Sequence, residues 1–279
     1  MKIIFFGASK FVIPIIKMLN KHFELTLVIT TERDESDVVP AFCKKNNIPY
    51  LSIKKASEAM QRLQEEKEAL GVLAYFGLLL PKELLETFTH GIINIHPSLL
   101  PKYRGATPVQ SALLSGETET GVTIIKLDEQ MDHGPILAQE KETILPTDTT
   151  ETLHARLFQK GTEMLEELIP LYGANKITLH PQNDTDATYT KRAFTRQDGF
   201  IDLDNLPETT ELDRMIRAYY PWPTVWTLLR LSATDEHANE KRIKLLPGNK
   251  LQMEGKKPVS IKDFINGYPE MKEIIQKLL

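Results

Sequence analysis

The strongest constraint on the fold is an alternation of short apolar segments with amphipathic segments along the first half of the chain. The expected strands, rich in β-branched and aromatic residues, are 2–6, 25–29, 71–75 and 92–95. The expected helices, in which apolar residues recur at helical spacing, are 11–19, 39–45, 57–68 and 81–88. Strand–helix alternation predicts an α/β, Rossmann-like sheet that is mostly parallel and has helices on both faces.

The second half of the chain follows a different pattern of expected elements. Two more strands are expected at 120–127 and 136–144, joined by a loop at 128–134 and followed by a long amphipathic helix at 149–171. Turn-forming and polar residues then predominate, and short β-like stretches follow them. We therefore predict one domain over residues 1–175, a linker over 176–190 and a smaller, β-rich domain over 191–279.

Composition narrows the class of protein. Of 279 residues, 41% are hydrophobic and 26% are charged, which predicts a well-buried soluble chain with room for two domains. No apolar run approaches the roughly 18 to 20 residues that span a bilayer, and the apolar start at 1–7 is too short for a secretory signal. A single cysteine, Cys43, excludes an internal disulfide and a multi-cysteine zinc site. A cytoplasmic location is expected.

Charge is unevenly distributed along the chain. The net charge of −4 argues against binding to nucleic acid through the overall field of the protein. Residues 239–262, however, hold seven basic residues and two acidic ones, whereas residues 32–37 hold four acids and one arginine. Any contact with phosphate is therefore expected to come from local basic clusters.

Three polar residues are the candidates for chemistry. Asn94 and His96 end an expected strand and are two positions apart, so their side chains share a face. Ligands in such sheets bind beyond the carboxyl ends of the strands, and the loop that contains Asp132 could return to the same end. An amide and an imidazole N–H can hold an oxyanion, while a carboxylate can orient the imidazole and assist proton transfer. This combination suits acyl transfer to an amine.

Simpler interpretations of these residues remain open at this point. A lone histidine at a strand end is more often a hydrogen-bonded structural residue, Asn94 could cap a turn, and Asp132 beside Gly134 could form an ordinary Asx-turn. A metal site at His96 and His133 is disfavoured, because they lack the i, i+4 spacing and a third obvious ligand. No metal is expected.

The sequence around these residues resembles that of a known family. The strings Ile-Asn-Ile-His-Pro-Ser-Leu-Leu-Pro-Lys-Tyr-Arg-Gly at 93–105, Glu-Thr-Gly-Val-Thr at 119–123 and Met-Asp-His-Gly at 131–134 resemble the signature of the formyltetrahydrofolate-dependent transferases. The resemblance implies that Asn94, His96 and Asp132 are catalytic and that 10-formyltetrahydrofolate is the co-substrate. The residues it implies for folate contact are Ser98, Leu99, Leu100, Pro101, Tyr75, Phe76, Gly77, Leu78, Asp128 and Met131. A plain turn is the alternative for 98–101.

Further segments are similar to the methionyl-tRNA formyltransferases within that superfamily. They are 11–14, 104–110, 182–189, 197–202, 216–223 and 255–264. This resemblance implies methionyl-tRNA as the acceptor, and a C-terminal domain that is a small β-barrel of the oligonucleotide-binding type.

Two departures from that pattern bear on the acceptor. The family's basic loop after the second strand is replaced by a shorter, acidic stretch at 31–37, and the middle of the C-terminal barrel is shortened between 247 and 251. Contacts with tRNA are then expected from Lys102, Arg104, Lys256 and Lys257. An amino-sugar nucleotide is the alternative acceptor, and hydrolysis of the formyl donor is a related third possibility.

Overall fold

The computed structural model describes residues 1–32, 38–64, 66–191, 193–230 and 240–278. These residues form two compact units that interleave along the sequence. The first comprises Met1–Pro108, Glu119–Thr143 and His154–Thr190, and the second comprises Val109–Thr118, Ile144–Leu153 and Lys191–Leu279. Residues 176–190 thus belong to the first unit. Most of the acidic stretch at 31–37 lies outside the described residues.

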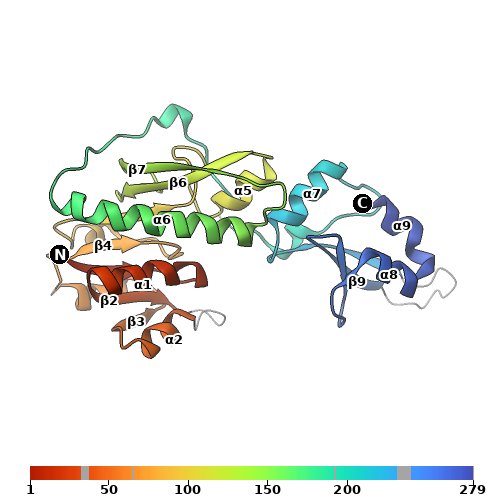
Figure 1. Cartoon of the computed structure of the whole chain (residues 1–279), viewed down its shortest axis with the longest axis horizontal. Helices are drawn as coiled ribbons and strands as arrows, with labels where there is room; N and C mark the ends of the chain where they lie inside the picture. The colour runs from red at the N-terminus through yellow and green to blue at the C-terminus, as the bar shows by residue number, and fades with distance from the viewer. Residues whose placement is uncertain (33–37, 65, 192, 231–239, 279) are drawn as a thin grey trace. The chain divides into compact units, whose positions relative to one another are not determined.

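The first unit is built on a seven-stranded sheet of order β3-β2-β1-β4-β5-β6-β7 (Figure 1). Its strands are β1 Lys2–Phe6, β2 Glu24–Thr31, β3 Tyr50–Ile53, β4 Leu70–Leu73, β5 Ile92–His96, β6 Glu119–Lys126 and β7 Ile136–Thr143. Strands β1 to β5 run parallel, while β6 and β7 are antiparallel to their neighbours. The predicted α/β fold with a mostly parallel sheet is confirmed.

The helices of this unit are shorter than expected in two regions, 57–68 and 81–88. They are α1 Ile13–His22, α2 Val38–Lys45, α3 Met60–Leu63, α4 Lys82–Leu85 and α6 Thr150–Gly173, with short 3-10 turns η1 Lys10–Val12, η2 Ala56–Ala59 and η3 Asp184–Asp186. The expected helix at 57–68 is only η2 and α3. Leu63 is the last apolar residue before Ala69, and the charged run between them has no apolar stripe to bury, so the helix ends at Leu63.

Packing on the two faces of the sheet determines where β5 points its polar residues. A core cluster that includes Phe6, Ile29 and Ile92 covers one face. On the other face, α6 approaches so closely that a Cβ at its Gly161 would lie 2.7 Å from Ile95 Cγ2. Since side chains alternate along a strand, Asn94 and His96 lie on the face that carries Ile92, opposite α6.

The second unit contains an antiparallel four-stranded sheet of order β11-β10-β9-β8. Its strands are β8 Val225–Arg230, β9 Glu240–Leu246, β10 Lys250–Met253 and β11 Val259–Ser260. Its helical elements are α5 Pro108–Leu114, α7 Thr209–Ala218, α8 Ile261–Gly267, α9 Lys272–Lys277, η4 Arg196–Gly199 and η5 Pro269–Met271. Strands β9 and β10 form a tight hairpin whose turn contains Gly248 and Asn249, both at positive φ. The prediction of a separate, smaller β-rich C-terminal region is confirmed.

Candidate active site

The three residues singled out in the sequence meet on one face of β5. The loop between β6 and β7 folds back over this face, and Asn94 Nδ2 donates a hydrogen bond to Asp132 Oδ1 at 3.3 Å. His96 Nδ1 lies 3.6 Å from Asp132 Oδ2. The side chains of Asn94 and His96 are both buried. An amide, an imidazole and a carboxylate are therefore assembled at the end of a central strand.

The Asp132 carboxylate is held by a second donor, from the backbone. The N–H of Gly105 donates to Asp132 Oδ2 at 2.8 Å. Asp132 itself has φ 49°, in the left-handed region that non-glycine residues seldom adopt. Such conformations persist where surrounding contacts fix them, and they concentrate at functional sites. The position of this carboxylate is thus set by its neighbours rather than by a relaxed loop.

The His96 ring is fixed between two oxygen atoms. Its Nε2 lies 2.9 Å from the carbonyl oxygen of Tyr103. A carbonyl oxygen only accepts, so Nε2 carries the hydrogen and donates it. The other nitrogen, Nδ1, faces Asp132. A proton taken up at Nδ1 would lie between the imidazole and a carboxylate, an arrangement suited to proton transfer.

The turn at 98–101 is held from within the protein. Ser98 Oγ donates to the carbonyl of Lys102 at 2.7 Å, and Thr123 Oγ1 both donates to the carbonyl of Ser98 at 2.6 Å and accepts from the N–H of Leu100 at 3.1 Å. Leu99 packs so tightly against Gly121 that a Cβ there would lie 2.4 Å from Leu99 Cδ2. The side chains of Ser98 and Leu100 are buried, and they shape the backbone of the turn.

The segment after β4 presents some of its residues to solvent and others to the core. Phe76 is 2% exposed and packs edge-to-face on Phe6, with 5.6 Å between ring centroids. Leu78 is partly buried against the same core cluster. Tyr75, by contrast, is 41% exposed, and in the β6–β7 loop Met131 is 46% exposed. Of these four residues expected to touch folate, Tyr75 and Met131 are the ones with exposed side chains.

Asp128 organises the β6–β7 loop around His133. Asp128 Oδ2 lies 2.6 Å from His133 Nδ1, and its other oxygen accepts from the N–H of Gln130 at 2.9 Å. The hydrogen bond from Asp128 raises the pKa of His133 above its usual value, and the nearby carboxylate of Asp184 acts in the same direction. Within the described ranges, no group of three or more His, Cys, Asp or Glu side chains is arranged to hold a metal ion.

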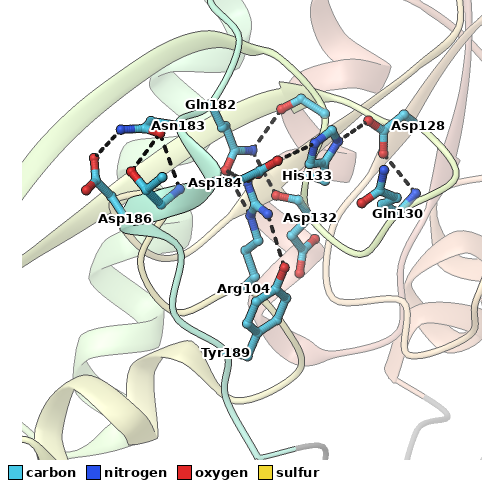
Figure 2. Close-up of polar contacts among 12 residues, drawn as sticks. Arg104, Asp128, Gln130, Asp132, His133, Gln182, Asn183, Asp184, Asp186 and Tyr189 are labelled. Carbon is cyan, nitrogen blue, oxygen red and sulfur yellow. Dashed lines mark hydrogen bonds and ion pairs between the residues drawn. The ribbon is translucent and has the colours of Figure 1, made fainter.

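A polar network beside the site was not anticipated from the sequence. Figure 2 shows the guanidinium of Arg104 surrounded by residues of the segment 180–190. Its Nε and Nη2 donate to Gln182 Oε1 at 3.1 and 2.9 Å, its Nη2 also donates to Asp184 Oδ1 at 2.8 Å, and its Nη1 donates to the hydroxyl of Tyr189 at 3.2 Å. These contacts join residues about 80 positions apart, for which the sequence carries no local signal.

The residues expected to contact tRNA differ in accessibility. Arg104 is only 1% exposed, so its side chain belongs to the internal network and does not reach solvent. Lys102 is exposed, as are Lys256 and Lys257 in the turn between β10 and β11. No helix in the described part of the chain is long and apolar enough to cross a membrane.

Comparison with known proteins places this arrangement in a family. Residues 1–169 match the family described as "Formyl transferase". The methionyl-tRNA formyltransferase of Thermodesulfovibrio yellowstonii is 32% identical over 301 aligned positions, which cover 95% of each chain. This chain belongs to the methionyl-tRNA formyltransferase family. The enzyme of that name from Chloroflexus aggregans is 45% identical over 173 positions, 62% of this chain and 55% of the relative. The resemblance inferred from the sequence is confirmed.

Solved structures of formyltransferases share the fold. An N-formyltransferase from Helicobacter canadensis, in complex with folinic acid and dTDP-3-aminofucose, aligns with a TM-score of 0.63 at 21% identity. The alignment covers 88% of this chain and 96% of that one. Because the identity is only 21%, this likeness supports the fold of the chain alone.

Proposed function

We propose that the protein transfers the formyl group of 10-formyltetrahydrofolate to the free amino group of L-methionyl-tRNA. The observation that carries the proposal is the assembly of Asn94, His96 and Asp132 on one face of β5. The similarity to a methionyl-tRNA formyltransferase over 95% of the chain supports the choice of acceptor. The site provides an acceptor for a proton and donors for an oxyanion, and the nucleophile would come from the substrate.

The roles of the three residues follow from their contacts. The amine attacks the formyl carbon, a new C–N bond forms, and the bond to the folate nitrogen breaks. An asparagine amide has two N–H donors, so one can remain on Asp132 while the other meets the developing oxyanion. His96 Nε2–H is engaged by the Tyr103 carbonyl, so the imidazole would favour the same oxyanion through the positive charge that it gains when Nδ1 takes up a proton. Asp132, opposite His96 Nδ1, assists removal of the amine proton, which balances the proton delivered to the leaving nitrogen.

The proposed folate contacts fall on three loops. Tyr75 follows β4 and Met131 lies between β6 and β7, and each exposes a large apolar surface. Gly77, exposed and at φ 78°, allows backbone to approach a ring closely. The turn at 98–101 would offer backbone groups, because its Ser98 and Leu100 side chains are buried. Folinic acid in the Helicobacter canadensis protein supports a reduced folate as the ligand.

The acceptor is tested by competition in one assay. Purified protein is given formyl donor carrying a labelled formyl group, together with charged initiator methionyl-tRNA and an amino-sugar nucleotide. We expect label in formylmethionyl-tRNA. Label only in the sugar nucleotide would reject the proposed acceptor, and label only in free formate would indicate hydrolysis. The variant Gln61→Glu, a change at an exposed position of α3 in the same unit, serves as the active control.

A further inference from the structure

The side chain of Gln182 lies between Arg104 and the loop that carries Asp132 (Figure 2). Its Nε2 donates to the carbonyl oxygens of Asp132 and Gly134, each at 2.8 Å. Its Oε1 accepts from Arg104 Nε and Nη2. An amide has two N–H donors and two acceptor lone pairs. All four hydrogen-bonding positions of this side chain are therefore occupied.

The orientation of the Gln182 amide follows from the chemistry of its partners. A guanidinium has donors and no acceptor, whereas the carbonyl groups of the loop have acceptors and no donor. Rotating the amide by 180° would place oxygen against two carbonyl oxygens and nitrogen against the guanidinium of Arg104. Only one orientation satisfies every group. The contact with Arg104 therefore orients the N–H donors of Gln182 toward the β6–β7 loop, which carries Asp132.

These contacts form a closed ring around Asp132. Gln182 holds the carbonyl of Asp132, and Arg104 holds Gln182. The next residue along from Arg104, Gly105, donates its N–H to the Asp132 carboxylate. The backbone of Asp132 is thus anchored through Gln182 to Arg104, and its side chain is anchored to the adjacent Gly105, which explains how its left-handed conformation at φ 49° is maintained.

Arg104 is itself fixed to the segment that contains Gln182. Its N–H donates to the carbonyl of Thr188 at 2.8 Å, and its carbonyl accepts from the N–H of Thr190 at 2.8 Å. Asp184 pairs with the guanidinium, and this hydrogen bond holds the pKa of Asp184 below its usual value. The segment 180–190 therefore lies on the first unit as part of the site's support.

We propose that Gln182 is a positioning residue, which sets the distance and angle of the Asp132 carboxylate relative to His96 and Asn94. The effect on turnover rests on the proposed function, because it assumes that Asp132 takes part in formyl transfer. The effect on the loop does not depend on the acceptor. Releasing two carbonyl groups of a strained loop would let its peptide planes rotate and move the carboxylate.

Two variants separate the donors of Gln182 from its size. Gln182→Glu keeps an acceptor for Arg104 but replaces the donors with a carboxylate oxygen that faces two carbonyls. Gln182→Met removes donors and acceptor at similar volume. The matched control is Gln61→Glu, the same change from amide to acid at an exposed position of α3 in the same unit.

Turnover is the first readout. We expect kcat for formylation of methionyl-tRNA to fall by at least about tenfold in both Gln182 variants, because small displacements of a catalytic group are costly. KM for both substrates should stay within about threefold, the pH–rate profile should be displaced, and Gln61→Glu should behave as wild type. Unchanged kcat in folded variants would overturn the proposal. So would a fall in kcat that is matched by increases in KM with an undisplaced pH profile.

Hydrogen exchange of the Gly105 amide is the second readout, and it is independent of the acceptor. This N–H is bonded to the Asp132 carboxylate, so a displaced Asp132 should leave it less protected. We expect faster exchange in both Gln182 variants and none of this change in Gln61→Glu. Unchanged protection would overturn the positioning role even if formylation is observed. An inactive wild type with faster exchange in the variants would reject the proposed function and leave the positioning role standing.

Discussion

At the scale of single residues, the Asp132 carboxylate is the point where the contacts of the site converge. Asn94 and Gly105 donate to it, and His96 faces it. Two of these groups could be anticipated from the sequence: Asn94 and His96 are two apart on a strand, where alternation places them together. The N–H of Gly105 and the carbonyl of Tyr103 could not, because backbone groups carry no residue-type signal.

The charge of Asp132, rather than its shape, should determine activity. Asp132→Asn keeps the size of the side chain but cannot accept a proton, and its NH₂ group would face either Gly105 N–H or the Asn94 amide. We expect kcat to fall by at least about 10²-fold, the scale of a lost general base or oxyanion donor. Steady-state kinetics and a thermal unfolding midpoint on the same preparation check this. A folded variant with near-normal turnover would exclude the proposed role.

His133 should make the loop's stability depend on pH. Its folded-state pKa is raised above the ordinary value of 6.5, chiefly by Asp128, so the charged form is favoured in the folded protein. Its stabilising contribution is therefore fully present below pH 6.5 and is lost as the pH rises through the raised pKa. We expect the difference in unfolding free energy between wild type and His133→Gln to shrink as the pH rises from below 6.5 through the raised pKa of His133. Urea unfolding between roughly pH 5.5 and 8.5 measures it.

The control for that measurement repeats the same comparison in the Asp128→Asn protein. There the main partner of His133 is neutral, and the His133→Gln substitution should have a much smaller pH-dependent effect on stability. A difference of equal size in both backgrounds would assign the pH dependence to another group, such as Asp184, which lies 3.4 Å from His133 Nε2.

At the scale of elements, the β6–β7 loop depends on a close approach of backbone at Gly134. A Cβ at this position would lie 1.8 Å from the carbonyl oxygen of Lys126, so Gly134→Ala must displace the loop that carries Asp132. We expect turnover to fall at least about tenfold, with a lower unfolding midpoint. Gly267→Ala is the matched control, because among the described residues no atom outside its chain neighbours and its own helix backbone lies within 4 Å of its added Cβ. Equal kcat for the two folded variants would show that loop position is not limiting.

Elements were predictable where an apolar pattern dictated them and not elsewhere. Strands β1, β2, β4 and β5 could be located because they are largely apolar runs, and β5 is buried at all five positions. Strand β3, with the mixed sequence Tyr-Leu-Ser-Ile, was missed. The polar stretch after Leu63 was misjudged as helix because charged residues have good helix propensity but bury nothing there. Residues 176–190 were expected to be a linker from their polar composition. Gln182 in this segment instead bonds to Arg104 and to the β6–β7 loop.

At the scale of the whole molecule, the sequence predicted the α/β class and a second β-rich region but not their interleaving. Residues 109–118 and 144–153 belong to the second unit although both flank strands of the first. Hydrophobic periodicity reports that a face is buried and not which partner buries it. The choice of acceptor also depends on the whole molecule, because contacts with a tRNA extend well beyond the reacting amine.

The last prediction concerns the exposed lysines of the second unit. Lys256 and Lys257 lie in the turn between β10 and β11 and, if they contact tRNA phosphates, each contributes a slope of roughly −0.9 in log affinity against log salt. The double variant Lys256→Ala/Lys257→Ala should therefore weaken tRNA use and flatten the salt dependence by up to roughly 1.8 units of slope. Its rate on a small amine acceptor should be unchanged.

The variant Lys44→Ala/Lys45→Ala, which removes two adjacent exposed charges from the end of α2, is the control. Apparent affinity for charged initiator tRNA at several salt concentrations decides the matter. Identical slopes in all three proteins would remove this turn from the tRNA path and leave Lys102 as the remaining exposed candidate of the original set.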